Sequence, residues 1–179
     1  GVPDLDVPIL SSNAELQVGV QVVLTTGLGG DKLTESDCGV RDVAAENFAD
    51  GLNEAAEDSA VRAVLIGGEG GTFCAGNDLM DFMANPPTGK ESPVGRFLTA
   101  LARFPKPLLA AVHGDAVGIG VTMLLYCDLA YAAEGTRFRM PFVQLGLAPE
   151  AGSTFLLPRA LGYRVATELL LTGDRFGTD

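Results

Sequence analysis

The chain is poor in histidine and cysteine, and this scarcity narrows the chemistry that it can support. Its 179 residues include one histidine, His113, and three widely separated cysteines, Cys38, Cys74 and Cys127. A single histidine excludes a histidine-rich metal site, and three scattered cysteines offer neither a disulfide framework nor a Cys-x-x-Cys metal site. We therefore expect reduced thiols and neither a metal ion nor a bound cofactor.

Long apolar runs and clusters of basic residues are also lacking. No run approaches the roughly 18 to 20 apolar residues of a membrane-spanning helix, and residues 1–6 lack the basic and apolar regions of a signal peptide. Lys and Arg number 12 against 23 Asp and Glu, which gives a formal net charge of −11. Such a chain is a poor partner for nucleic acid or a membrane, and we expect a cytoplasmic location.

What the chain does have is enough apolar residues for one core, arranged in alternating patterns. Hydrophobic residues make up 47% of the sequence, which predicts a single domain over residues 1–179. Alternation of apolar and polar residues predicts a strand over 16–25, and helical spacing predicts a helix over 43–55, capped by residues 34–37. The same reasoning predicts an α/β fold, with further strands at 62–66, 108–112, 128–132 and 137–140, and further helices at 94–103, 121–126 and 154–171, the last one divided at Gly162.

Two glycine-bearing turns, residues 74–78 and 117–120, each follow a buried strand and each open a helix. Such a turn leaves unpaired backbone N–H groups at the positive end of the helix dipole and lets a ligand approach the backbone closely. Two donors that converge on one oxygen make an oxyanion hole. Glycines at these positions also serve packing, so the turns alone leave both interpretations open.

Dinucleotide binding is excluded by the spacing of the glycines. The turn at residues 27–30 lacks the third glycine of the dinucleotide motif, because that position is Lys32. The turn at residues 118–120 lacks it as well, since its third position is Met123. No Gly-Lys-Ser/Thr of a phosphate-binding loop is present.

Several motifs in order along the chain resemble the enoyl-CoA hydratase/isomerase (crotonase) superfamily. Phe73-Cys-Ala-Gly-Asn-Asp-Leu79 resembles its Phe-Cys-Ala-Gly-x-Asp-Leu signature, and residues 106–114 resemble its Lys-Pro-x-Ile-Ala-Ala-Val-x-Gly strand. Residues 118–128 and 141–158 are similar to the segments that follow. The resemblance implies a crotonase-like fold, a superhelix of ββα units, with an acyl-CoA thioester as substrate and a homotrimer or a dimer of trimers as the assembly.

The resemblance also implies a set of site residues. By position, the backbone N–H groups of Asn77 and Ile119 correspond to the two oxyanion donors of the family. The superfamily usually has glycine at the second position, so the side chain of Ile119 must point away from the ligand. The residues implied to bind substrate are Ala75, Gly76, Asp78, Leu79, Gly118 and Phe142. Asp78 is also placed to cap the helix that begins there.

The two glutamates with which hydratases of the family activate water are replaced here by Thr122 and Phe142. Neither side chain is a general base at neutral pH, so water addition is disfavoured. Glu150, within residues 147–153, resembles the glutamate of the Δ3,Δ2-enoyl-CoA isomerases, which moves a proton between C2 and C4 of the acyl chain. A carboxyl in an apolar pocket has a raised pKa, which suits this proton transfer.

Other interpretations of these residues stay open at this stage. Glu150 could instead face the dipole of the following helix, and His113 is interpreted as a structural hydrogen-bonding residue. Other reactions of the superfamily, such as hydration, thioester hydrolysis or decarboxylation, are alternatives to isomerisation. A non-catalytic acyl-CoA-binding paralogue is the alternative outside enzymes.

The sequence departs from the superfamily pattern at two places. Residues 25–33 lack the Asn-Arg-Pro turn and the Asn-Ala pair that line the coenzyme A pocket, and Lys32 beside Asp31 stands there instead. Residues 173–179 end the chain where members of the superfamily continue into a helical subdomain. We therefore expect the C-terminal helical part to be missing and the last helices to expose apolar surface.

Overall fold

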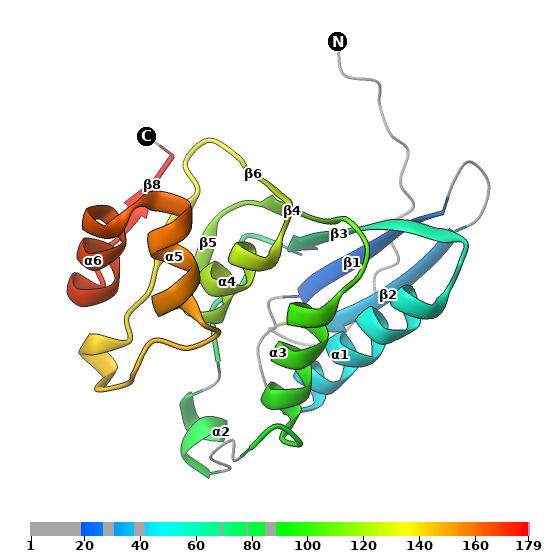
Figure 1. The fold of residues 1–179 in the computed structure, drawn as a ribbon, viewed down its shortest axis with the longest axis horizontal. Helices are drawn as coiled ribbons and strands as arrows, with labels where there is room; N and C mark the ends of the chain where they lie inside the picture. The colour runs from blue at the N-terminus through cyan, green and yellow to red at the C-terminus, as the bar shows by residue number, and fades with distance from the viewer. Residues whose placement is uncertain are drawn as a thin grey trace.

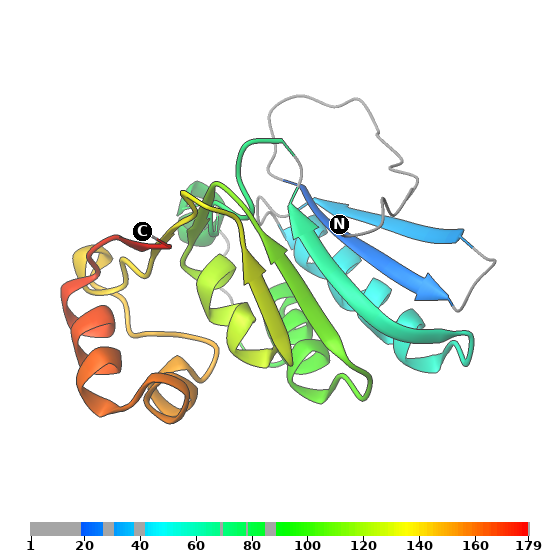
Figure 2. The ribbon, with the colours of Figure 1, turned by 90° about the horizontal axis from the view of Figure 1, so that it is seen from above.

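The computed structural model describes residues 19–26, 31–37, 42–68, 70–77, 79–84 and 89–178. Within these residues a five-stranded sheet has the order β2-β1-β3-β4-β6. Figure 2 shows this sheet as a fan, with β2 and β1 at one edge and β6 at the other.

The sheet is antiparallel at one edge and parallel at the other. β1 (Gly19–Thr26) pairs antiparallel with both β2 (Asp31–Asp37) and β3 (Val61–Gly68). β4 (Leu108–Val112) lies parallel to β3 and to β6 (Leu129–Ala132). The parallel pairs need crossover connections, which the intervening helical segments supply.

The predicted cap at residues 34–37 is wrong, because these residues belong to β2. Their polar side chains suit a helix start locally, but the backbone pairs in register with β1 from Asp31 to Asp37. The helix α1 (Asp42–Glu57) begins a few residues later. Pairing with a neighbouring strand has overridden the local preference.

α1 and α3 (Pro93–Arg103) pack against each other over one face of the sheet (Figure 1). The Phe48 and Phe97 rings meet edge to face with centroids 4.9 Å apart. Ser92 caps α3 because its hydroxyl accepts the Gly95 N–H at 3.1 Å.

Lys106 ties the C-terminus of α1 to the start of β4. Its ammonium group donates to the carbonyls of Ala55 and Asp58 at 2.5 and 2.6 Å. These carbonyls lie at and just beyond the last turn of α1, where a cation also complements the helix dipole.

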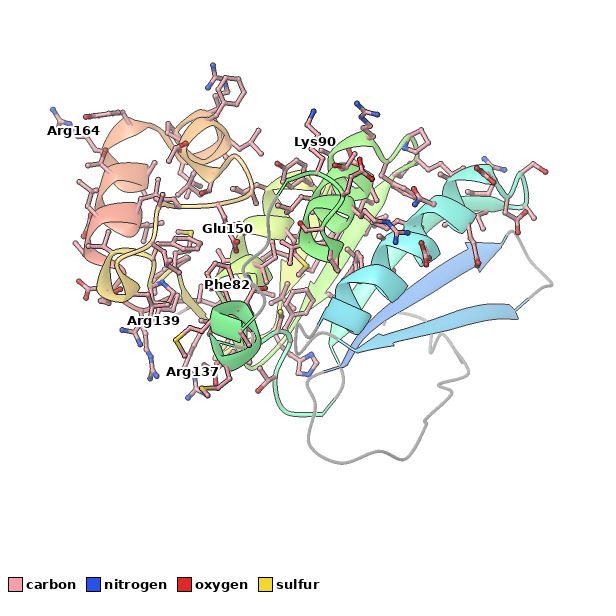
Figure 3. The ribbon with its side chains drawn as sticks, turned by 90° about the horizontal axis from the view of Figure 1, so that it is seen from below. Phe82, Lys90, Arg137, Arg139, Glu150 and Arg164 are labelled. Carbon is pink, nitrogen blue, oxygen red and sulfur yellow. The ribbon has the colours of Figure 1, made fainter. Side chains whose placement is uncertain are left out.

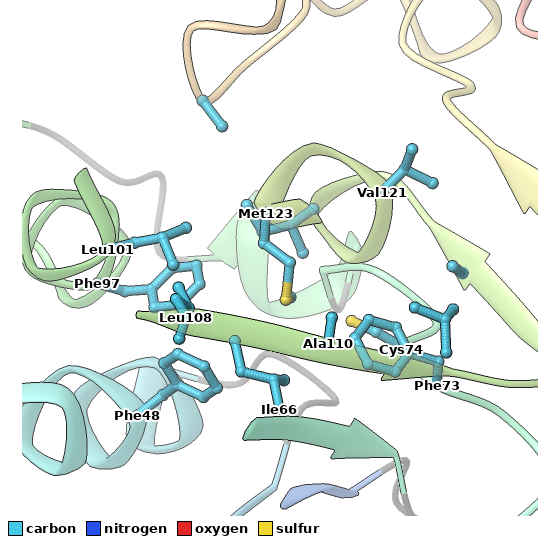
Figure 4. Close-up of a cluster of buried hydrophobic side chains, with 14 of the residues drawn as sticks. Phe48, Ile66, Phe73, Cys74, Phe97, Leu101, Leu108, Ala110, Val121 and Met123 are labelled. Atoms are coloured by element: carbon cyan, nitrogen blue, oxygen red, sulfur yellow. The ribbon is translucent and has the colours of Figure 1, made fainter. Parts of the chain in front are cut away.

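The hydrophobic core lies between the sheet and the helices that cover it (Figure 4). Phe48 and Leu52 of α1 are buried as their helical spacing predicts. They share the core with side chains from α3, from β3 and β4 and from the segment after β4, among them Phe97, Leu101, Ile66, Leu108, Ala110 and Met123.

A second, three-stranded sheet has the order β5-β7-β8. Its strands are β5 (Asp115–Val117), β7 (Arg137–Arg139) and β8 (Phe176–Gly177). Asp115 accepts two hydrogen bonds from the Arg137 guanidinium at 2.8 and 2.6 Å, and this pairing lowers the pKa of the Asp115 carboxyl. Asp115 is therefore a strand residue with an ion-pair partner.

The remaining elements are helices that lie between strands in chain order. They are α2 (Leu79–Ala84), α4 (Ile119–Thr122), the 3-10 helices η1 (Met123–Tyr126) and η2 (Val143–Leu145), α5 (Ser153–Leu161) and α6 (Tyr163–Thr172). The predicted division of the last helix at Gly162 is confirmed. α5 and α6 lie beyond the β6 edge of the sheet (Figures 1 and 2). Among the described residues, no helix has the length and apolar character that a membrane crossing requires.

Candidate active site

A cavity of about 550 Å³ lies between the two glycine turns, α2, α3 and the segment that leads into α5. Seven of the nine site residues implied by the sequence line it, namely Ala75, Gly76, Asn77, Gly118, Ile119, Phe142 and Glu150. Asp78 lies outside the described residues. Leu79 begins α2, and its side chain lies outside the described part of the structure.

The first turn is held against the second by backbone hydrogen bonds. The N–H groups of Phe73 and Cys74 donate to the Asp115 carbonyl at 3.0 and 3.1 Å, and the Val117 N–H donates to the Cys74 carbonyl at 2.8 Å. Gly76 has a φ of +92°, and a Cβ there would lie 3.1 Å from the Val117 carbonyl oxygen. Glycine at position 76 therefore allows the close approach of the two turns.

The second turn presents the N-terminus of α4 to the cavity. Gly118 has a φ of +57° and donates its N–H to the Arg139 carbonyl at 2.9 Å, while the Gly118 carbonyl accepts the N–H groups of Val121 and Thr122. No carbonyl of the described residues accepts the Ile119 N–H. This group is one of the orphan donors of a helix start, at the positive end of the backbone dipoles.

The side chain of Ile119 points into the core, where it is 2% exposed. An isoleucine in place of glycine leaves the backbone N–H accessible only if its side chain turns away from the ligand, and burial of this side chain in the core favours that orientation. Next to it, a Cβ on Gly120 would lie 2.7 Å from the Cys74 Cβ. The start of α4 therefore packs directly on the first turn.

Asn77 lines the cavity and is half-buried. Its side-chain oxygen is buried and has no hydrogen-bond partner among the described residues. Two glycine turns and an amide thus border the same space, and they form one polar part of a largely apolar wall.

Glu150 provides the only carboxyl among the described residues that line the cavity. It is half-buried, and loss of solvent raises the pKa of its carboxyl above the ordinary value for glutamate. Glu150 belongs to the loop that precedes α5, and Figure 3 shows it on the side of that loop toward α3, with Phe82 of α2 nearby in that view. Phe82, Leu145 and Leu147 also line the cavity, so the carboxyl shares it with apolar side chains.

The two positions that carry glutamates in hydratases offer no second base. Phe142 lines the cavity and is buried, whereas Thr122 is fully buried and is not a lining residue. The Thr122 hydroxyl has no hydrogen-bond partner among the described residues. The arrangement therefore supports proton transfer by one carboxyl better than activation of a water molecule by two.

Some cavity residues were not expected from the sequence. Arg139, which adjoins the second turn, and Gln144 line the cavity. Both side chains also donate to the C-terminus of α6, to the carbonyls of Gly173 and Thr172 respectively. No motif signals them, because their position depends on how the last helix packs. Val94 and Leu98 line the cavity from one face of α3, and their spacing of four residues could have indicated this shared face.

The surroundings of His113 and of Cys127 indicate structural roles for both side chains. A ring nitrogen of His113 lies 2.9 Å from the Gly70 carbonyl oxygen, which agrees with a structural hydrogen bond. Burial raises the pKa of the Cys127 thiol to about 12, so this thiol is not a nucleophile near neutral pH. Among the described residues there is no group of three or more His, Cys, Asp or Glu that could hold a metal ion.

The fold and the cavity define a class of α/β protein in which two backbone turns and one half-buried carboxyl face a largely apolar pocket. The chain belongs to the enoyl-CoA hydratase/isomerase family, whose sequence profile matches residues 40–179. The solved structure entitled "Structure of Pseudomonas aeruginosa OdaA" is 46% identical with a TM-score of 0.79, over 88% of this chain and 65% of that one. The predicted crotonase-like α/β fold is confirmed.

Curated relatives have several different activities in their names. A 1,2-epoxyphenylacetyl-CoA isomerase of Escherichia coli (strain K12) is 39% identical over 74% of this chain and 53% of its own length. The human enoyl-CoA delta isomerase 2 is 37% identical over 69% of this chain and 33% of its own length. An enoyl-CoA hydratase of Alternaria alternata is also 37% identical, over 65% of this chain and 40% of its own length. The chain thus spans about half or less of the length of these relatives.

Proposed function

We propose that the cavity binds an enoyl-CoA thioester and moves its double bond between the Δ3 and Δ2 positions. The single observation that carries this proposal is Glu150, a half-buried carboxyl with a raised pKa and no second carboxyl among the described residues that line the cavity. The human relative named enoyl-CoA delta isomerase 2 supports the same choice.

The thioester carbonyl oxygen would accept hydrogen bonds from the backbone N–H groups of Asn77 and Ile119. These donors would stabilise the negative charge that develops on this oxygen when a proton leaves C2, each by about 3 to 4 kcal/mol. The glycine conformations of both turns favour such an approach of the ligand to the backbone.

Glu150 would act as the base and then as the acid. Its carboxylate takes a proton from C2, and the electron pair of that C–H bond spreads over a dienolate whose charge lies on the thioester oxygen. The same carboxyl returns the proton at C4, which leaves the double bond at C2–C3 in conjugation with the thioester. No water, metal ion or redox partner is needed for this sequence.

The test is an assay of the full-length protein with 3-enoyl-CoA and with 2-enoyl-CoA, followed by the absorbance of the conjugated thioester. We expect conversion of 3-enoyl-CoA, and a loss of about 10²- to 10⁴-fold in kcat for Glu150→Gln. Glu134→Gln is the matched control, because Glu134 is exposed in a turn.

Each other outcome identifies a different function. Full activity of Glu150→Gln would refute the proposal, and hydration of 2-enoyl-CoA would show hydratase chemistry. Release of free coenzyme A would show thioester hydrolysis, and loss of carbon dioxide from a carboxylated acyl-CoA would show decarboxylation. Tight coenzyme A binding without turnover would show a non-catalytic acyl-CoA-binding paralogue.

A homotrimer or a dimer of trimers is the proposed assembly. The described C-terminal helices expose large apolar side chains, including Phe155, Tyr163 and Leu171. Such surface favours burial against another part of the protein or another subunit. Light scattering of the full-length protein after size exclusion should give three or six times the monomer mass, and a monomer would contradict this prediction.

A further inference from the structure

The backbone immediately after Glu150 adopts a conformation that needs support from its surroundings. Ala151 has a φ of 52° and is the only residue other than glycine with a positive φ among the described residues. It is 8% exposed, and Gly152 follows it with a φ of 63°. A left-handed conformation is unfavourable for a residue that carries a Cβ, and it persists where neighbouring groups hold it.

The backbone carbonyls of Glu150 and Ala151 are both held by hydrogen bonds. The Glu150 carbonyl accepts from the Ser153 N–H at 2.9 Å and from the Ser153 hydroxyl at 2.6 Å. The Ala151 carbonyl accepts from the Tyr126 hydroxyl at 2.7 Å. Ser153 is fully buried and Tyr126 is half-buried, so water competes poorly for these bonds.

Position 152 leaves little space beside the tyrosine. A Cβ on Gly152 would lie 3.3 Å from the Tyr126 hydroxyl oxygen, closer than an ordinary contact, and the positive φ also favours glycine there. The tyrosine, the left-handed alanine and the glycine therefore fit one another as a unit.

Tyr126 connects this loop to the oxyanion turn. It is the last residue of η1, which continues directly from α4, and α4 begins at Ile119. One continuous helical segment thus starts with a candidate oxyanion donor and ends with a hydrogen bond to the residue next to the candidate base. The relative position of donor and base depends on this segment.

We infer that Tyr126 is a positioning residue that fixes the Glu150 carboxyl relative to the oxyanion hole through its hydrogen bond to the Ala151 carbonyl, an inference that rests on the proposed isomerase function. Burial raises the pKa of the Tyr126 phenol, so the hydroxyl stays protonated and remains a donor over the working pH range.

The test is Tyr126→Phe, which removes the hydroxyl and keeps the ring. A displacement of about 1 Å can lower a rate by about 100-fold, so we expect kcat to fall by at least about 10-fold while KM changes by less than about twofold. Tyr131→Phe is the matched control, because Tyr131 is 66% exposed. It should keep the parent kcat.

A double mutant separates a positioning role from a general structural one. If Tyr126 acts through Glu150, adding Tyr126→Phe to Glu150→Gln should lower the residual rate by less than about twofold. A further loss equal to that of the single mutant would overturn the inference, because the tyrosine would then act on the hole or on the fold.

Two more outcomes are informative. Parent-like kcat in Tyr126→Phe, together with a large loss in Glu150→Gln, would refute the positioning role and leave the isomerase function intact. Full activity in Glu150→Gln would refute the function itself.

Circular dichroism and thermal melts accompany each variant. If Tyr126→Phe does not fold, Ser153→Ala provides the second test, since it removes one of the two donors to the Glu150 carbonyl. It should lower kcat about threefold or more without raising KM, and a rise in KM alone would count against the inference.

Discussion

Gly120→Ala should damage the proposed oxyanion hole without touching any residue that would contact substrate through its side chain. A Cβ at position 120 would lie 2.7 Å from the Cys74 Cβ and 2.9 Å from the Cys74 carbonyl oxygen. An ordinary contact begins near 3.4 Å, so the start of α4 and the first turn would have to separate by about 0.7 Å. Overpacking of this kind destabilises proteins by about 1 to 3 kcal/mol.

The separation would also move the Ile119 N–H away from the Asn77 N–H, since Ile119 immediately precedes Gly120. Oxyanion donors act over a narrow range of distance, and loss of one donor lowers kcat by about 10²- to 10³-fold. With a shift smaller than complete loss, we expect kcat to fall by about 10- to 100-fold. The assay is the conversion of 3-enoyl-CoA, combined with urea denaturation to measure the free energy of unfolding.

Gly71→Ala is the matched control for this substitution. No atom of the described residues lies within 4 Å of a Cβ built on Gly71, and its φ is outside the range that disfavours side chains. The control should keep both the stability and the kcat of the parent. A Gly120→Ala protein with the kcat and stability of the parent would refute the argument that Gly120 sets the spacing of the two turns.

Three further predictions concern titration, helix capping and thiol reactivity. Because burial raises the pKa of Glu150, the folded chain holds this proton more tightly than the unfolded chain, and the stability gained from protonation is lost as the pH rises through the folded-state pKa. Glu150→Gln should therefore unfold at higher urea than the parent near pH 8, and the difference should shrink as the pH falls. Lys106→Met should lower the free energy of unfolding by about 1 to 3 kcal/mol, because two carbonyls at the end of α1 lose a charged donor. Cys127, with a thiol pKa of about 12, should resist iodoacetamide at pH 8 in the folded protein and react in denaturant, as read by peptide mass spectrometry.

Each of these predictions has a result that would contradict it. A Glu150→Gln protein less stable than the parent at alkaline pH would mean that the carboxylate is stabilised in the folded chain. Lys90→Met, at an exposed lysine, is the control for Lys106→Met, and equal stability of the two variants would argue against the cap. Rapid alkylation of Cys127 in the native protein would contradict its burial.

The sequence predicts best those elements whose signals are local. The helical spacing of Phe48, Leu52 and Ala55 identifies α1, and the run from Leu108 to Val112 matches β4. These patterns depend on which face of an element is buried, and a single sequence contains that information.

The parts that the sequence did not predict depend on contacts between distant residues. β2 has the composition of a helix cap and becomes a strand because β1 lies beside it. β5 precedes the second glycine turn at a place where the sequence predicts no strand, and it forms by pairing with β7. The Tyr126 hydroxyl reaches a carbonyl 25 residues away, and no local pattern indicates that bond.

For the candidate site, the resemblance implied nine residues from the order of the motifs, and seven of them line one cavity. The contacts that hold these residues in place could be identified only in the folded chain. The turns and Glu150 follow from the resemblance to the superfamily. Arg139 and Gln144 enter the wall through bonds to the end of α6, which only the tertiary structure reveals.

The proposed oxyanion hole uses main-chain N–H groups as donors, and this has an evolutionary consequence. A mutation at Asn77 or Ile119 exchanges a side chain and leaves an N–H at the same place, provided the glycines around it still allow the turn. With the donors proposed above, the binding of a carbonyl oxygen is inherited with the backbone, while the acids and bases that face it are free to change by single codons. Proteins that share these turns can therefore diverge in reaction without rebuilding the part that holds the substrate, which accords with relatives named as isomerases and as a hydratase.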